Sequence, residues 1–112
     1  MLENPIGKKP RATSKRWLVG APECVIDVFD SGDTVVDRYS VWMRFDPEYT
    51  VPGYVDYLGL SENPEHPQGF SQWAHLSWSR FSRYRRTARR QRIRWGDLPE
   101  NVRDHVRKRL AS

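Results

Sequence analysis

Cysteine, long apolar runs and metal-ligand motifs are all scarce in this sequence of 112 residues. Cys24 is the single cysteine, which excludes an internal disulfide and a four-cysteine metal site. A reducing cytoplasm is therefore the expected compartment. No stretch approaches the roughly 18 consecutive apolar residues that cross a membrane, and no apolar block follows the first lysines as in a secretory signal. These absences predict a protein without a membrane partner.

Apolar residues form only 38% of the chain, but five Trp, five Tyr and four Phe are among them. Because aromatic side chains bury a large area each, they can supply a small but sufficient core. The sequence therefore predicts a folded protein and not a disordered one.

Acidic residues are missing from one stretch, since the chain from Arg80 to Arg94 has eight arginines and no aspartate or glutamate. Residues 79–112 hold twelve basic and three acidic side chains, a net charge of +9. Residues 21–66 hold two basic and ten acidic ones, a net charge of −8. Either the two poles attract each other within the fold, or the basic pole binds an external polyanion. The arginines outnumber the carboxylates expected near them, which favours the external partner.

The start of the chain is basic and lacks apolar periodicity. Residues 1–16 hold two prolines, one glycine and five basic side chains. This composition predicts a flexible basic arm ahead of a single domain at 17–112. The arm is either a solvated tail or a segment that lies along phosphates. Its candidate phosphate-binding residues are Lys8, Lys9 and Arg11.

Three runs of β-branched and aromatic residues predict an antiparallel meander, because sequential strands usually pair. They lie at 24–29, 34–45 and 54–60, and Asp30-Ser31-Gly32-Asp33 predicts a turn between the first two. On the second strand, alternation places one set of side chains on the core face. This set is Val35, Asp37, Tyr39, Val41, Met43 and Phe45. Asp37 is the one charged residue in this set.

The spacing of aromatic residues after Pro67 predicts one long helix over 68–91. One side of this helix holds the residues that would pack on the sheet: Phe70, Trp73, Ser77, Phe81, Tyr84 and Ala88. The rest of its circumference holds the arginines, together with Leu76 and Trp78. The pattern indicates a helix with aromatic residues inward and arginines outward.

The end of the chain predicts a short edge strand at 92–95, ended by Gly96, and then a closing helix. Asp97 is a suitable N-cap and Pro99 suits the first turn. An apolar seam at four-residue spacing would face the core: Leu98, Val102, Val106 and Leu110. The predicted fold class is α+β, a small antiparallel meander of three or four strands packed by one long basic helix and a C-terminal helix.

An arginine face with an aromatic residue beside it suits phosphate contact combined with base stacking. The sequence therefore predicts a non-enzymatic protein that binds nucleic acid, DNA or RNA, or a ribonucleoprotein. Arginine is also frequent at protein interfaces, so a small inhibitor or adaptor that docks on an acidic protein is the alternative. A plain solvated face is the third interpretation. The candidate contacts, besides those in the arm, are Arg80, Arg83, Arg85, Arg86, Arg89, Arg90, Arg92 and Trp78.

Candidate catalytic groups are few: Asp27, Asp30, Asp33, Asp37, His66 and His75. Asp27 and Asp37 could face each other across the first hairpin and hold Mg²⁺. However, the chain has no zinc-ligand spacing, phosphate-cradling glycine loop or nucleophile motif. We expect no enzyme, metal or cofactor. If there is chemistry, the residues to test are Asp37, His66 and Gln68.

Two polar motifs stand out. One is the hairpin Asp30-Ser31-Gly32-Asp33-Thr34 with Asp37-Arg38-Tyr39 behind it, and the other is the loop Ser61-Glu62-Asn63-Pro64-Glu65-His66-Pro67-Gln68-Gly69-Phe70. Both resemble motifs of short uncharacterised bacteriophage and bacterial proteins, so the cell expected from this resemblance is a bacterial or infected host cell. The likeness covers about residues 25–73 and 92–110, and departs from that group in the arm and the arginine-rich segment. No activity is established for the group, so the resemblance implies only a common scaffold motif, either a hydrogen-bonded loop or a pocket. Its residues are Asp37, Asn63, His66, Gln68 and Gly69.

Overall fold

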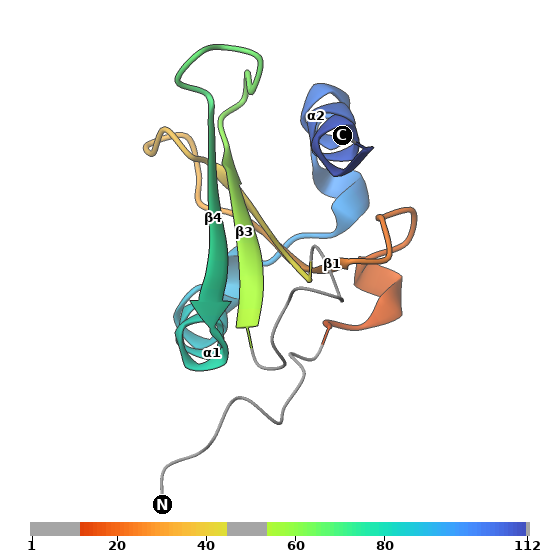
Figure 1. Ribbon diagram of the computed structural model, residues 1–112, viewed down its shortest axis with the longest axis vertical. Helices are drawn as coiled ribbons and strands as arrows, with labels where there is room; N and C mark the ends of the chain where they lie inside the picture. The colour runs from red at the N-terminus through yellow and green to blue at the C-terminus, as the bar shows by residue number, and fades with distance from the viewer. Residues whose placement is uncertain (1–11, 45–53, 112) are drawn as a thin grey trace, which may run out of the picture.

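The computed structural model describes residues 12–44 and 54–111, apart from the side chain of His75. The elements along these residues are η2 (Lys15–Trp17), β1 (Val25–Asp30), β2 (Tyr39–Met43), β3 (Tyr54–Leu60), β4 (Phe70–Ser77), α1 (Trp78–Thr87), η3 (Arg89–Gln91), η4 (Trp95–Asp97) and α2 (Glu100–Ala111), where η denotes a 3₁₀-helix (Figure 1). The predicted core residue Phe45 and the arm residues Lys8, Lys9 and Arg11 lie outside the described part.

The four strands form one antiparallel meander in the order β1-β2-β3-β4. Both α-helices follow the sheet in sequence. The predicted α+β class is confirmed. The strands predicted at 24–29 and 54–60 are found as β1 and β3, to within one residue at each end.

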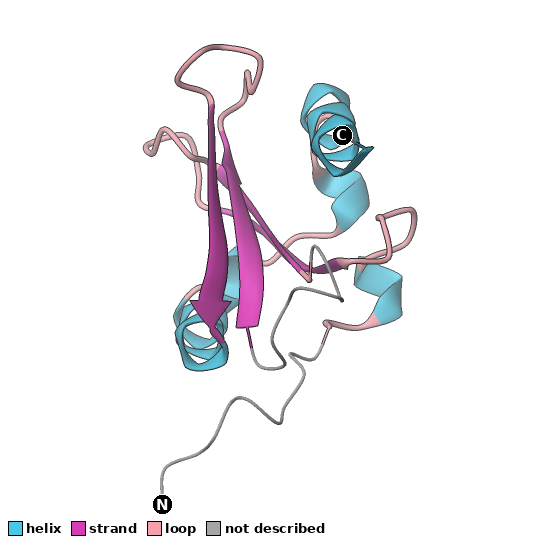
Figure 2. Cartoon of the chain, viewed as in Figure 1, coloured by secondary structure: helices cyan, strands magenta, loops and turns pink. Residues whose placement is uncertain are grey.

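Each face of the sheet buries its own core beside one helix. The core beside α2 consists of Val25, Val28, Tyr39, Val41, Met43, Leu58, Leu60, Trp95, Leu98, Val102 and Val106. The core beside α1 consists of Ile26, Phe29, Trp42, Val55, Phe81 and Ala88. Figure 2 shows the strands between the two helices. The prediction of a single core face on the second strand is therefore wrong, because all five residues of β2 are buried.

The second strand is also shorter than predicted. Asp30 and Arg38 close the hairpin through two hydrogen bonds, at 2.8 and 3.1 Å, before β2 begins. Residues 33–37, between them, form turns and bends. Val35 and Val36 are 47% and 72% exposed, so the placement of Val35 in the core is wrong.

The largest departure from the sequence prediction lies at residues 70–77, which form a strand instead of the first half of a helix. β4 pairs with β3, but Tyr57 faces Trp73 whereas Val55 faces Leu76. One extra residue of β4 thus lies between these pairs, which makes a β-bulge. The bulge places Trp73 and Leu76 on the same face, although residues three apart in a regular strand point to opposite faces.

Only the second half of the predicted helix is helical. The Ser77 hydroxyl caps α1 by accepting a hydrogen bond from the backbone N–H of Arg80 (3.1 Å), so β4 passes into α1 with no loop between them. The inward residues of α1 and its C-cap pack on the sheet as predicted: Phe81, Tyr84 and Ala88. Phe70 instead packs against the core beside α2, and Trp73 is 60% exposed. The helical assignment of these two residues is wrong.

The terminal helix begins later than predicted. α2 starts at Glu100, and the Asp97 carboxylate accepts a hydrogen bond from the backbone N–H of Arg94 (3.0 Å) within η4 instead of capping α2. The predicted edge strand reduces to one bridge between Arg92 and Phe29. The apolar seam is confirmed, since its first three residues are buried and the fourth packs against them: Leu98, Val102, Val106 and Leu110.

The loop between β3 and β4 is held by its own backbone. The N–H of His66 donates to the Asn63 carbonyl (3.1 Å), that of Gly69 to the His66 carbonyl (2.8 Å), and that of Ser61 to the Gly69 carbonyl (2.9 Å). A Cβ at position 69 would overlap the Asn63 carbonyl oxygen. Glycine is therefore needed here because two backbone segments approach closely.

Gly69→Ala should lower the free energy of unfolding by about 2 kcal/mol, because the added methyl meets backbone that cannot shift without breaking the loop hydrogen bonds. Gly96→Ala is the matched control, since nothing lies within 4 Å of its Cβ position. Urea unfolding of both variants measures the difference. Equal stability of the two variants would contradict this account of the loop.

Candidate functional site

Asp27, a candidate catalytic carboxylate, is the buried centre of an ion-pair cluster. Its side chain is fully buried on the α1 face of β1. Oδ2 accepts a hydrogen bond from Nε of Arg85 (3.0 Å), and Oδ1 accepts from Nε of Arg92 (3.1 Å) and from the backbone N–H of Val28 (3.1 Å). Both oxygens are therefore engaged within the fold.

Arg85 and Arg92 were predicted to face outward and contact phosphates, and this prediction is corrected by the structure. Their side chains are only 22% and 23% exposed. The Arg85 guanidinium lies over the ring of Phe81 (4.5 Å to its centroid) and that of Arg92 over Phe29 (5.8 Å). Both arginines neutralise Asp27 and pack on the core.

The electrostatics of this cluster indicate a structural role. Burial raises the pKa of Asp27 above its ordinary value, and the charges of Arg92 and Arg85 oppose that rise. Both guanidinium groups thus favour the charged form of the carboxylate. With three donors on its two oxygens, it is not placed to hold a metal ion or a substrate.

Five arginines remain on the outer surface of α1 and η3, and we call them the arginine face: Arg80, Arg83, Arg86, Arg89 and Arg90. Within the described residues, none of them has a carboxylate at ion-pair distance. The first three are spaced three residues apart on α1, so their side chains follow one another along the helix surface. Within the described part of the chain, the face is thus a concentrated positive charge without a paired carboxylate.

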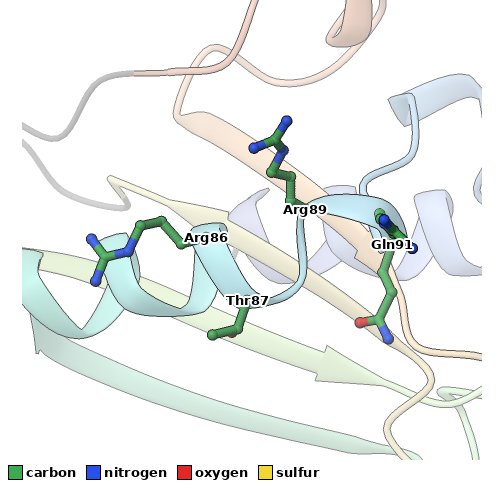
Figure 3. Close-up of a pocket in the computed structure, with 5 residues that line it drawn as sticks. Arg86, Thr87, Arg89 and Gln91 are labelled. Atoms are coloured by element: carbon green, nitrogen blue, oxygen red, sulfur yellow. The ribbon is translucent and has the colours of Figure 1, made fainter.

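The surface is hollowed at the end of α1. A depression of about 530 Å³ is lined by Arg86, Thr87, Arg89, Arg90 and Gln91. Figure 3 shows the side chains of Arg86 and Arg89 pointing in different directions from the backbone. Separated cationic groups around an open depression suit an extended anion with several charges better than a small enclosed one.

The tryptophan beside the arginine face is not the predicted one. Trp78 is half-buried and its ring contacts Phe81, with centroids 5.8 Å apart, so it belongs to the core beside α1. Trp73, which the helical spacing placed in the core, is exposed and lines a second hollow together with Arg80. Sequence reasoning missed Trp73 because its orientation depends on the strand register, which residue spacing does not reveal.

Most of the motif residues take part in hydrogen bonds within the loop between β3 and β4. The loop contacts described above account for three of them: Asn63, His66 and Gly69. The backbone N–H of Gln68 donates to Nδ1 of His66 (3.1 Å), again within the loop. Asp37 lies apart from these and accepts a hydrogen bond from the Ser71 hydroxyl (3.0 Å). These contacts are those of a hydrogen-bonded loop.

The candidate carboxylates of the described residues do not come together as predicted. The cross-strand neighbour of Asp27 is Trp42, so Asp27 and Asp37 do not face each other across the hairpin as predicted. Asp30 is paired with Arg38, and the hydrogen bonds from that guanidinium lower the pKa of Asp30. Among the described residues, no three His, Cys, Asp or Glu side chains are grouped so that they could hold a metal ion.

Comparison with protein-family models, curated proteins and solved structures gives no match for this chain. The resemblance to short bacteriophage and bacterial proteins therefore stays a prediction. In the described part of the chain, no helix has the length and apolar character needed to cross a membrane.

Asp27→Asn should destabilise the fold by about 3 kcal/mol, because it leaves the guanidinium groups of Arg85 and Arg92 without their shared anion in a partly buried site. Asp104→Asn removes one negative charge from an exposed pair with Arg107 (3.2 Å), and should cost less than about 1 kcal/mol. Urea unfolding at neutral pH distinguishes the two. Similar small losses in both variants would show that the Asp27 cluster does not hold the fold together.

Proposed function

We propose that this protein binds nucleic acid through phosphate contacts to the arginine face of α1 and η3, without an enzymatic activity of its own. The observation that supports this most directly is the absence, within the described residues, of any carboxylate paired with the five arginines of that face. The basic arm adds Lys8, Lys9 and Arg11 to the proposed contacts on sequence grounds.

The charge distribution favours a polyanion as the partner. α1 has ten residues, so it is about 15 Å long, and like charges at this spacing repel one another in the free protein. A phosphate backbone relieves the repulsion and releases its condensed counterions, which drives association. Guanidinium groups also match phosphate geometry with two parallel hydrogen bonds.

An acidic protein is less well matched to this surface. Protein interfaces need an apolar centre surrounded by polar groups. Among the described residues the exposed large apolar side chains are Val19, Val35, Val36 and Trp73. Only Trp73 lines a hollow with a residue of the arginine face. The arginine face and the neighbouring Trp73 thus offer positive charge and one exposed indole. These groups suit contact with phosphates and stacking of a base.

Arg83→Gln combined with Arg86→Gln should weaken binding to a labelled DNA or RNA single strand and lower the salt dependence of that binding. Each lost phosphate contact reduces the slope of log K against log salt by about 0.7 on a single strand, so the double variant should lose about 1.4. Fluorescence anisotropy between about 50 and 200 mM salt measures the slope.

Arg107→Gln combined with Lys108→Gln is the control, because it removes two positive charges from α2, on the other side of the sheet. This variant should keep most of the wild-type slope. Equal losses in both double variants would refute the assignment of the arginine face. Absence of binding by the wild-type protein at low salt would refute the function, and a stoichiometric protein partner that survives nuclease treatment of a lysate would support the adaptor alternative.

A further inference from the structure

A second hollow, of about 310 Å³, lies where α1 meets β3 and β4, and it is lined by Trp42, Tyr57, Trp73, Leu76, Arg80 and Tyr84. Four of these six side chains are aromatic and one is cationic. Its volume is at the lower end of the range of about 300–1,000 Å³ for ligand sites. The hollow therefore suits one flat ring system with a negative charge nearby.

One wall of the hollow is a row of aromatic side chains across the sheet. Trp42 pairs with Tyr57 and Tyr57 pairs with Trp73 in the strand register, so all three point to the α1 face. The rings of Trp42 and Tyr57 are in edge contact with centroids 4.9 Å apart, and Trp42 also contacts Tyr84 at 5.1 Å. These inner rings hold one another in place.

Trp73 ends this row and is the part that remains open. Its side chain is 60% exposed, and among the described residues no other aromatic ring makes contact with its indole. The β4 bulge keeps Trp73 on the same face as Leu76. A large aromatic surface is thus presented to solvent by a strand whose register is fixed.

The hollow also contains hydrogen-bonding groups. The Tyr84 hydroxyl is within hydrogen-bond distance of the Ser40 hydroxyl (3.1 Å). The Tyr57 hydroxyl is protonated at neutral pH, and burial raises its pKa to about 12. An occupant with polar edges and apolar faces fits these walls better than a purely apolar one.

We infer that this hollow receives one unpaired nucleobase, stacked on the indole of Trp73, with an adjoining phosphate bound by Arg80. The inference rests on the proposed function and deepens it, because it assigns single-stranded nucleic acid as the preferred ligand class. A base inside a duplex is already paired and stacked on both faces, and cannot enter the hollow without being extruded.

The position of Arg80 joins the two parts of the surface. It lines the hollow, and it is also the first residue of the arginine face. A strand with one base on Trp73 can therefore continue along α1 past Arg83 and Arg86. This arrangement, a basic track beside an aromatic platform, is the general design of single-strand binding without sequence readout.

Trp73→Ala tests the inference by comparing two single strands of equal length, one of thymidine nucleotides and one of abasic sugar-phosphate units. The variant should bind the thymidine strand about tenfold more weakly, because it loses one stacked base. Binding to the abasic strand and the salt slope on either strand should not change. Trp73→Phe should restore most of the affinity for the thymidine strand.

Trp17→Ala is the matched control, since it removes an indole that lies under Arg94 and outside the hollow; it should leave the preference for the thymidine strand unchanged. Equal binding of the thymidine and abasic strands by the wild-type protein, with a steep salt slope, would refute the binding of a base in the hollow. That result would still support the phosphate contacts. Failure of every strand to bind would refute the proposed function itself. Equal effects of Trp73→Ala on both strands would also overturn the stacking assignment.

Discussion

The carboxylate of Asp27 is fully buried, and two arginines from the second half of the chain form ion pairs with it. Its partners come from α1 and from the residue after η3, so the arginine-rich segment is tied to β1 at two points. Loss of both partners would leave a buried charge uncompensated, at a cost of several kcal/mol. The constraint divides the arginines into two kinds. Those that reach Asp27 lie within the fold, and those of the arginine face remain available to a ligand.

Much of the fold could be predicted from local patterns in the sequence. Alternating β-branched residues and the turn after Asp30 identified the first strands, and an apolar seam identified α2. The prediction failed at β4 because Phe70 and Trp73, three residues apart, fit one face of a helix, whereas in the strand Phe70 packs on the core beside α2 and Trp73 lies on the α1 face. The strand depends on pairing with β3, a non-local contact that periodicity within one segment cannot contain.

The candidate site was predictable in composition but not in detail. The run without acidic residues correctly indicated an excess of positive charge, since five of the arginines have no carboxylate partner within the described residues. Which arginines face inward could not be predicted, because Asp27 is far from them in sequence. The interpretation that the two poles attract each other within the fold is partly right, since Asp27 pairs with Arg85 and Arg92. The sequence wrongly placed Trp73 in the core, because the orientation of its side chain depends on the pairing of β4 with β3.

The direct passage from β4 into α1 at Ser77 has a consequence for the thermodynamics of association. Trp73 and Arg80 belong to a continuous hydrogen-bonded segment with no loop between them. A ligand that spans both residues therefore does not have to order the protein backbone. In the proposed complex, the loss of conformational entropy would fall on the flexible strand, whose torsions would become fixed as its base stacks. Association at this surface should accordingly have a favourable enthalpy opposed by an unfavourable entropy.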